Sequence, residues 1–299
     1  MQSPQHTLDD LASQGYIAND EIAMAVYLAK ALNKPLLIEG PPGVGKTELA
    51  KAVAGVLDAP VIRLQCYEGL DETKAIYEWK YGKQLLYTQI LKEQLDSVVG
   101  SNNNLQDAMA NLHKADDVFF APEFLEPRPL LQALQHEGEC VLLIDEIDKS
   151  DEEFEALLLE MLADNQLSLP EIGTIKAEQA PVVFLTSNSM RELSDALKRR
   201  CLHLYIPFPD KALETKILLT KVPDINEQLA EQLASFIDSL RDLDLKKQPA
   251  VSETIDWAKA LILLHAQSLS IELVESTLFL IQRNIKKSWY RLLQQFFEV

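Results

Sequence analysis

The stretch Gly40-Pro41-Pro42-Gly43-Val44-Gly45-Lys46-Thr47 decides the fold. It matches the pattern G-x-x-x-x-G-K-[ST], in which a glycine-rich loop wraps the phosphates of a nucleotide. An apolar run at 35–39 precedes it, as expected for a buried strand, and apolar residues at helical spacing follow over 48–57. Glycines let successive backbone N–H groups converge on phosphate oxygens, and the helix adds the positive end of its dipole. This context predicts a nucleotide site rather than an ordinary glycine turn before a helix.

Two side chains of the loop have specific expected roles. Lys46 is expected to reach the β- and γ-phosphates, and the Thr47 hydroxyl is expected to coordinate Mg²⁺. ATP with Mg²⁺ is therefore the expected ligand. The residues expected to contact the nucleotide are Gly40, Pro41, Pro42, Gly43, Val44, Gly45, Lys46, Thr47 and Glu48.

A pair of carboxylates follows a later apolar run. Residues 140–144 lead directly into Asp145 and Glu146. We expect Asp145 to hold Mg²⁺, directly or through water, and Glu146 to polarise the water that attacks the γ-phosphate. Taken alone, an apolar run ending in Asp-Glu is more often structural than catalytic. Its place after the phosphate loop in an alternating α/β chain favours the catalytic interpretation.

A further polar residue ends the next predicted strand. The apolar run at 181–185 continues into Thr186, Ser187 and Asn188. Polar residues at the carboxyl ends of central parallel strands face the ligand crevice. Asn188 is therefore expected to contact the γ-phosphate or to orient the attacking water, although an isolated Asn would only indicate a turn.

Composition narrows the class of protein. The 299 residues are 47% hydrophobic, which is typical of a globular chain, and the formal net charge of −18 argues against an electrostatic grip on nucleic acid. No run of 18 apolar residues predicts a membrane span, and the polar, acidic residues 1–10 do not resemble a signal peptide. We expect a cytoplasmic protein. Cys66, Cys140 and Cys201 share no C-x-x-C spacing, which argues against a cysteine-based metal site.

The pattern along the chain divides it into two predicted domains. Residues 1–208 alternate strands and helices, and residues 209–299 after the Pro207-Phe208-Pro209 break carry only helical patterns. The first domain carries a long insert within 66–139 and a hairpin at about 165–178. Aromatic residues in the insert favour ordinary packing over nucleic-acid stacking, because few basic residues separate Tyr77, Trp79, Tyr81 and Tyr87. Strands are predicted at 35–39, 61–64, 140–144, 181–185 and 201–206. Helices are predicted at 20–32, 129–134, 151–162 (with Ser150 as N-cap), 211–222, 226–241, 252–266 and 271–298.

Together these motifs resemble the AAA+ ATPases, and within them the MoxR family. The stretches that carry the resemblance are 40–47, 142–149, 172–175 and 184–188. Residues 124–134 and 252–257 are similar to the branch found beside von Willebrand factor A proteins, including those that mature carbon-monoxide dehydrogenase. The resemblance implies an α/β fold, with a five-stranded parallel P-loop NTPase sheet between helices and a small all-helical lid domain after it.

The resemblance also implies an assembly. Such proteins are typically hexameric rings with the nucleotide between subunits. Arg200, with Arg199 as the alternative, would then complete the neighbour's site as an arginine finger. Without that context, a basic pair at a helix C-terminus would be interpreted as a cap or as surface.

One departure from the family concerns the lid. Many relatives carry an arginine at the start of a lid helix, where it senses the γ-phosphate, but residues 250–254 contain none. Lys246 or Lys247 could substitute. The leading hypothesis is an ATP-hydrolysing remodelling protein that acts on a client protein or metalloenzyme with a von Willebrand factor A partner. A nucleotide-gated binding module with slow hydrolysis is the alternative, and a nucleic-acid motor is a weaker one.

Overall fold

The computed structural model describes residues 1–83, 85–86, 124–169, 173–243 and 247–281. Tyr87, Lys246 and much of the predicted insert lie outside these residues. So do the tip of the predicted hairpin and most of the last predicted helix.

A five-stranded sheet forms the centre of the N-terminal part, and all of its neighbouring strands run parallel. This confirms the predicted sheet. Its strands in spatial order are β2 (Val61–Gln65), β5 (Val141–Asp145), β8 (Val182–Ser187), β1 (Leu36–Glu39) and β9 (Leu202–Tyr205).

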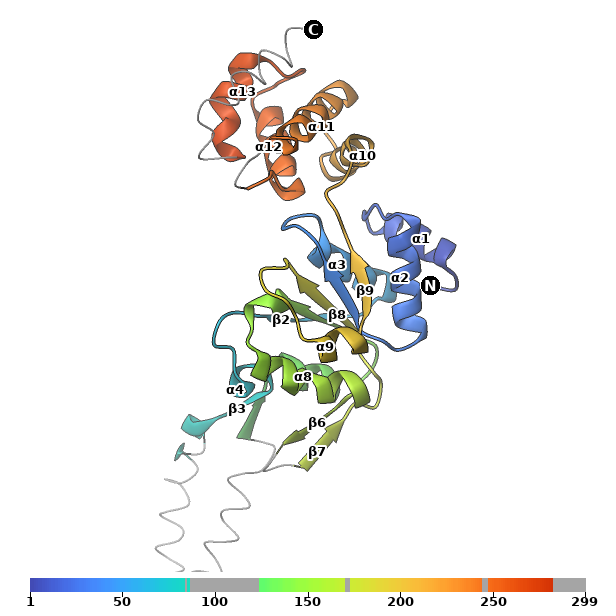
Figure 1. Ribbon diagram of the computed structural model, residues 1–299, viewed down its shortest axis with the longest axis vertical. Helices are drawn as coiled ribbons and strands as arrows, with labels where there is room; N and C mark the ends of the chain where they lie inside the picture. The colour runs from blue at the N-terminus through green and yellow to red at the C-terminus, as the bar shows by residue number, and fades with distance from the viewer. Residues whose placement is uncertain (84, 87–123, 170–172, 244–246, 282–299) are drawn as a thin grey trace, which may run out of the picture.

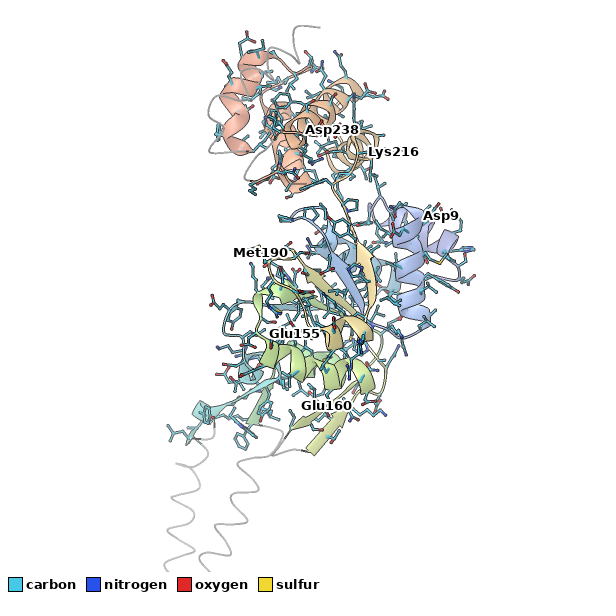
Figure 2. All side chains as sticks on the ribbon, viewed as in Figure 1. Asp9, Glu155, Glu160, Met190, Lys216 and Asp238 are labelled. Atoms are coloured by element: carbon cyan, nitrogen blue, oxygen red, sulfur yellow. The ribbon has the colours of Figure 1, made fainter. Side chains whose placement is uncertain are left out.

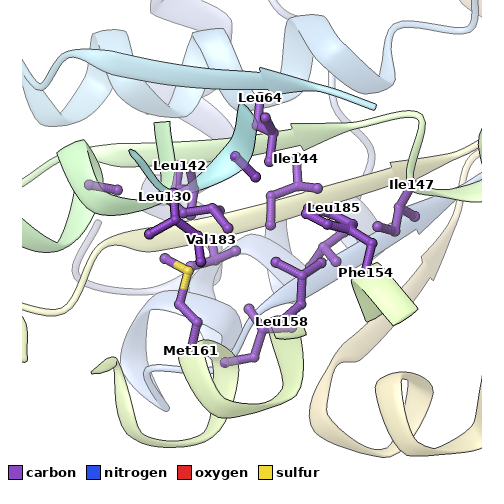
Figure 3. Close-up of a cluster of buried hydrophobic side chains, with 14 of the residues drawn as sticks. Leu64, Leu130, Leu142, Ile144, Ile147, Phe154, Leu158, Met161, Val183 and Leu185 are labelled. Atoms are coloured by element: carbon purple, nitrogen blue, oxygen red, sulfur yellow. The ribbon is translucent and has the colours of Figure 1, made fainter. Parts of the chain in front are cut away.

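Helices cover both faces of this sheet (Figure 1). On one face lie α1 (Pro4–Ser13), α2 (Asp20–Ala31) and α3 (Lys46–Leu57). On the other lie α7 (Pro129–Gln135), α8 (Glu152–Asp164) and α9 (Asp195–Arg200). Because successive residues of a strand point to opposite faces, the three central strands β5, β8 and β1 each contribute to two separate cores. In β1, Leu37 packs into one core, and Leu36 and Ile38 pack into the other. Figure 3 shows the first core, where β5 and β8 meet side chains of α8.

Side-chain caps explain where several helices begin. Asn19 caps α2, as its position before the helical pattern indicates, by accepting from the Ile22 N–H. Asp151 rather than Ser150 caps α8, because its carboxylate accepts from the Phe154 N–H at 2.9 Å. The prediction of Ser150 as N-cap was wrong. Helix α1 was not predicted, although Ser3 caps it and Pro4 begins it, which are ordinary helix-start signals.

Two small antiparallel ribbons lie at the end of the molecule opposite the C-terminal helices (Figure 1). The first pairs β6 (Gln166–Leu169) with β7 (Gly173–Lys176), as the hairpin pattern predicted. The second follows α4 (Glu72–Ala75) and pairs β3 (Tyr77–Trp79) with β4 (Leu125–Pro127). The rings of Tyr77 and Trp79 meet edge to face at 5.7 Å.

The C-terminal part of the chain is helical, as predicted, and has its own core. Its elements are α10 (Lys211–Lys221), α11 (Glu227–Arg241), α12 (Val251–Leu263), α13 (Ile271–Thr277) and the short η3 (Leu278–Leu280). Trp257 is fully buried at the centre of this core, and its indole N–H donates to the Thr277 hydroxyl at 2.7 Å. Among the described helices, none is both long and apolar enough to cross a membrane.

Candidate nucleotide site

Three neighbouring strands bring the predicted site residues together. The phosphate loop follows β1, Glu146 follows β5, and Asn188 follows β8. In parallel strands these carboxyl ends lie at one edge of the sheet, which is where α/β proteins bind ligands. Residues that are far apart in the chain therefore meet at one place, beside the phosphate loop.

The backbone of the phosphate loop requires glycine at two close approaches. A Cβ on Gly40 would lie 2.1 Å from the carbonyl oxygen of Ile206, and its φ is +151°. A Cβ on Gly43 would lie 2.5 Å from the Ala250 Cβ and 2.8 Å from the Ser252 Oγ. Because all three distances are shorter than real Cβ contacts, a larger residue would push the loop away from the end of β9 or from the start of α12.

Lys46 is the buried cation of the site, with a side chain that makes three hydrogen bonds. Its Nζ donates to the carbonyl oxygens of Gly40 at 2.6 Å and Pro41 at 2.8 Å, and to Asn188 Oδ1 at 2.8 Å. Burial lowers the pKa of Lys46 to about 8, although the carboxylates of Asp148, Asp145 and Glu146 oppose that shift. The positive charge of the buried ammonium is thus only partly stabilised by its neighbours, which suits a group that binds anions.

Asp145 is buried, and both of its carboxylate oxygens are occupied. Oδ1 accepts from the Thr186 hydroxyl at 2.5 Å and from the Thr47 hydroxyl at 3.1 Å. Oδ2 accepts from Arg63 Nε at 3.0 Å and from a terminal guanidinium nitrogen at 2.5 Å. Thr47 and Asp145 lie side by side at the phosphate loop, and their hard oxygens are the donors that Mg²⁺ prefers.

No group of three or more His, Cys, Asp or Glu side chains is arranged to hold a metal in the described part of the chain. An ion at Thr47 and Asp145 would therefore need water and phosphate oxygens to complete its shell. Mg²⁺ is commonly bound in this way, through one or two carboxylates and the substrate phosphates.

Glu146 lies beside the same point with a fixed carboxylate. Its Oε2 accepts from Gln65 Nε2 at 2.8 Å and from Lys149 Nζ at 2.6 Å, and its Oε1 accepts from Asn188 Nδ2 at 3.3 Å. Its backbone is left-handed, with φ of 58°, and its N–H donates to the Thr186 hydroxyl. A non-glycine residue in this conformation is strained, and such strain is often found at functional sites.

Asp148 holds the loop that carries Asn188. Its Oδ2 accepts the backbone N–H groups of Asn188 at 3.1 Å and Met190 at 2.9 Å. A second anchor follows, because Arg191 pairs with the buried Glu155 of α8, and Glu155 also accepts from the Ser194 N–H. Figure 2 labels Glu155 and, in the loop itself, Met190. The loop between β8 and α9 is thus attached at both of its ends.

A cavity of about 340 Å³ opens beside the phosphate loop, large enough for a small-molecule ligand. Lys46, Thr47, Asp145, Glu146 and Asn188 are among the residues that line it. Apolar side chains also line it: Ile22, Ile206, Pro207, Leu213, Ile217 and Val251. Tyr16 borders the cavity next to Gly45, and burial, followed by the charge of Glu48, raises the pKa of its phenol. The lining therefore offers polar groups for a nucleotide's phosphates and apolar surface for its base.

Arg199 and Arg200 lie away from this cavity. They end α9 immediately before β9, whose first residue pairs with the amino end of β1. The phosphate loop follows the carboxyl end of β1, so the two arginines are at the other edge of the sheet. Both are exposed, and Arg200 donates to the Ala196 carbonyl oxygen at 3.1 Å. The structure does not bring them to the site of their own chain.

The start of α12 packs over the phosphate loop, where a lid arginine would be expected in many relatives. Ala250 and Ser252 approach Gly43, and both Val251 and Ser252 line the cavity. Lys247 instead forms an ion pair with Glu253 and does not line the cavity.

Residues 36–209, more than half of the chain, match the family model "ATPase family associated with various cellular activities (AAA)". The chain belongs to the AAA family. The Haloferax mediterranei gas vesicle ATPase GvpN is 26% identical over 71% of this chain and 57% of its own length. Uncharacterized proteins of Staphylococcus epidermidis and Staphylococcus aureus are 25% identical over 77% of this chain and 76% of theirs. This AAA chain thus spans little more than half of the gas vesicle relative.

Solved structures similar to this AAA protein include the Thermotoga maritima RuvB Holliday junction branch migration motor. That match is 18% identical, covers 93% of this chain and 72% of the other, and has a TM-score of 0.47. A variant of the same protein covers 100% of this chain and 79% of its own, with a TM-score of 0.48.

Several residues at the AAA site were not predicted from the sequence. They are Arg63, Gln65, Asp148, Lys149 and Thr186, each of which contacts a predicted site residue. Arg63 and Gln65 are two residues apart in β2, so their side chains point to the same face of the sheet as Asp145 on the neighbouring β5. That spacing was the available signal, but it indicates a site only once β2 is known to lie beside β5.

Proposed function

We propose that this AAA protein binds ATP with Mg²⁺ in the cavity and hydrolyses it to ADP and phosphate. One observation carries the proposal: Lys46, Asp145, Glu146 and Asn188 come from three strand ends and converge beside the same glycine-rich loop. The relative named as a gas vesicle ATPase supports the same activity.

Lys46 and the loop would bind the phosphates. The three acceptors of the Lys46 ammonium are two loop carbonyls and an amide, all of them neutral. Phosphate oxygens offer a stronger, charge-assisted alternative, so the lysine exchanges these bonds for the nucleotide. The N–H groups of residues 43–48 and the positive end of α3 add to the attraction.

Thr47 and Asp145 would hold the metal. When bound, Mg²⁺ neutralises charge on the phosphates. The Thr186 hydroxyl keeps the Asp145 carboxylate in orientation, since it donates to Oδ1 while accepting from the Glu146 N–H.

Glu146 would act as the general base toward the attacking water, with Asn188 orienting it. The Asn188 amide already links the phosphate-binding lysine to the proposed base, since its Oδ1 accepts from Lys46 and its Nδ2 donates to Glu146. General base catalysis of this kind contributes about 10²–10⁴ in rate.

The active form would be a homo-oligomeric ring, hexameric in MoxR relatives, in which Arg200 or Arg199 completes the site of the next subunit. The exposure of both arginines and their distance along the sheet from their own loop support a role in a neighbour. An arginine finger is worth about 10³–10⁵ in rate.

The cellular role would be remodelling of a client protein or metalloenzyme in the cytoplasm, in the manner of the MoxR family and with a von Willebrand factor A partner. The division at residue 208 would let the helical lid move against the sheet domain. The β6–β7 hairpin and the β3–β4 ribbon extend away from the lid and would supply contacts to a client.

A mixing experiment tests hydrolysis and the shared site together. Glu146→Gln and Arg200→Ala chains are each expected to lose at least about 10²-fold in turnover. In a mixture, Glu146→Gln chains present Arg200 to Arg200→Ala chains that retain Glu146, so turnover should rise well above the sum of the two. A mixture no more active than the sum would exclude Arg200 acting between chains, and full activity of Glu146→Gln alone would exclude Glu146 as the base.

A gated binding module with slow hydrolysis is the second candidate. It is favoured by the contacts of Glu146 to Gln65 and Lys149, which occupy the base, and by the engagement of Lys247 with Glu253. A single-turnover rate slower than subunit exchange in the same preparation would favour this candidate over a remodelling enzyme.

A further inference from the structure

Arg63 holds one oxygen of the carboxylate that is expected to bind the metal ion. Two nitrogens of its guanidinium contact Asp145 Oδ2, and one of them also contacts Gln65 Oε1. Oδ1 accepts from the hydroxyls of Thr186 and Thr47, and the Thr47 hydroxyl also lies 3.3 Å from Oδ2. We infer that Arg63 and the metal ion compete for Asp145, so that Arg63 makes metal binding conditional on the nucleotide. This inference rests on the proposed function, because it concerns the same metal position.

Charge explains the competition. Asp145 carries one negative charge and is buried, with only 3% of its surface exposed, so it stabilises one neighbouring cation well and two poorly. A metal bound to Oδ2 would lie within a few ångströms of the guanidinium, and the two would repel each other. Nucleotide phosphates bring several negative charges to the same place, which makes the metal the stronger competitor.

Arg63 is also placed so that it can leave. Its side chain is 50% exposed, whereas Asp145 is enclosed, so the guanidinium reaches the carboxylate from the open side of the site. Arginine stays charged and is weakly hydrated, and it therefore keeps Asp145 paired until it is displaced. Lys46 could not replace it, because its three donors are directed at the loop carbonyls and Asn188.

The experiment measures Mn²⁺ binding to the full chain, without nucleotide, from the electron paramagnetic resonance signal of the free ion. Arg63→Ala is expected to bind Mn²⁺ about fivefold more tightly than the unmodified protein, the ratio expected for a partly exposed ion pair. Arg63→Lys keeps the positive charge but loses the two-nitrogen contact of the guanidinium, so its Mn²⁺ affinity should lie between those of Arg63→Ala and the unmodified protein. Adding Asp145→Asn to Arg63→Ala should abolish the gain.

A matched control removes one positive charge elsewhere. Lys30→Ala breaks the ion pair of Lys30 with Glu139, which lies before the amino end of β5 and so at the other edge of the sheet. Its Mn²⁺ affinity should equal that of the unmodified protein. As a second readout, Mn²⁺ should raise the thermal unfolding midpoint of Arg63→Ala more than that of Lys30→Ala.

The inference is overturned if Arg63→Ala binds Mn²⁺ no more tightly than the unmodified protein, including the case in which neither binds at millimolar concentrations. It is also overturned if Lys30→Ala shows the same gain. Failure of the proposed function would look different: Mn²⁺ affinities as expected, with no ATP turnover by the unmodified protein under any condition.

Discussion

The nucleotide site and the C-terminal helices each bury a charged cluster, and the two differ in how completely the charges are satisfied. In the helical part, Arg241 makes a two-point ion pair with Glu214 at 2.6 and 3.0 Å. The same guanidinium donates to the carbonyl oxygens of Pro249 and Pro209 and lies 4.6 Å from the centre of the Phe208 ring. Glu214 also accepts from the buried Thr254 hydroxyl. Every charged group in this cluster has a strong partner of opposite charge or a hydrogen bond.

The cluster at the nucleotide site is arranged otherwise. Lys46 is bonded to neutral oxygens only, and the cation on Asp145 comes from a half-exposed arginine. The comparison teaches that burial of charge alone does not identify a functional site. What distinguishes the site is that its partners are replaceable and border a cavity, whereas the Arg241 cluster joins the linker after β9 to α10, α11 and α12.

The largest expected effect is on the Arg241 cluster, which we call the closed cluster because each of its charged groups has a partner; the cluster at the nucleotide site is the open one. Arg241→Ala leaves Glu214 buried beside a single hydroxyl, and breaking a buried pair in this way costs about 3–5 kcal/mol of unfolding free energy. Burial already raises the pKa of Glu214 against the opposing effect of Arg241. A buried carboxyl whose folded-state pKa is raised lowers the unfolding free energy of the protein as pH rises from the unfolded pKa toward the folded one. The variant should therefore recover part of its stability near about pH 5, compared with about pH 7. Denaturant titration at these two pH values measures both the loss and the recovery.

Two variants sharpen this comparison. Glu214→Leu combined with Arg241→Met removes both charges and should be more stable than Arg241→Ala alone. Lys46→Met should leave the unfolding free energy unchanged or higher, because it removes a buried ammonium whose pKa is lowered. Equal destabilisation by Lys46→Met and Arg241→Ala would contradict the distinction between the clusters.

A smaller effect is expected at Asp148, which supports the open cluster through the Asn188 loop. Asp148→Ala leaves the part-buried N–H groups of Asn188 and Met190 without their acceptor, and each lost hydrogen bond is worth about 0.5–1.5 kcal/mol. The loop should shift, and kcat for ATP should fall by about tenfold or more while nucleotide affinity changes little, because Lys46 and the glycine loop remain. Steady-state kinetics together with a direct binding measurement separates the two.

Asp148→Asn is the matched control. Its amide oxygen can accept both N–H groups, so most of the turnover should return. If Asp148→Asn were as impaired as Asp148→Ala, the charge of Asp148 rather than its hydrogen bonds to the loop would be what matters.

The sequence predicted the part of the site whose residues occupy diagnostic local positions. Lys46, Asp145 and Asn188 each follow or end an apolar strand, so their meeting at one sheet edge could be predicted from the pattern. Arg63 could not be placed in this way, because its contact depends on β2 lying beside β5, and a long connection separates these strands in the chain. The pairing of Glu214 with Arg241 depends in the same way on how two helices pack.

The five-stranded parallel sheet and the helical C-terminal region were predicted correctly, because periodicity and proline breaks are local signals. The roles of Arg199 and Arg200 are different in kind. They depend on a second copy of the chain, so neither the sequence pattern nor the fold of one chain decides them.

The smallest expected effect is a pH dependence of nucleotide binding that arises from Lys46. With its ammonium bonded to two carbonyls and Asn188, its pKa is about 8, lowered mainly by burial. Because this folded-state pKa is below the unfolded value, the cost of burying the charge is fully present below about pH 8. It is relieved as pH rises toward the unfolded pKa of about 10.4, so this group raises the unfolding free energy over that interval. Phosphate favours the charged form, so binding has the opposite dependence.

Above about pH 8 the nucleotide must therefore bind together with a proton, and its affinity should fall by up to about tenfold per pH unit. Calorimetric titration with ADP and Mg²⁺ at about pH 9, in buffers of different ionisation enthalpy, should detect the proton uptake directly. Lys46→Arg provides the control, because an arginine stays charged over this range and should bind without proton uptake, whatever its absolute affinity. Binding to the unmodified protein with no proton uptake and a constant affinity up to about pH 9 would mean that Lys46 keeps its proton throughout. The site would then resemble the closed Arg241 cluster more closely than its neutral acceptors indicate.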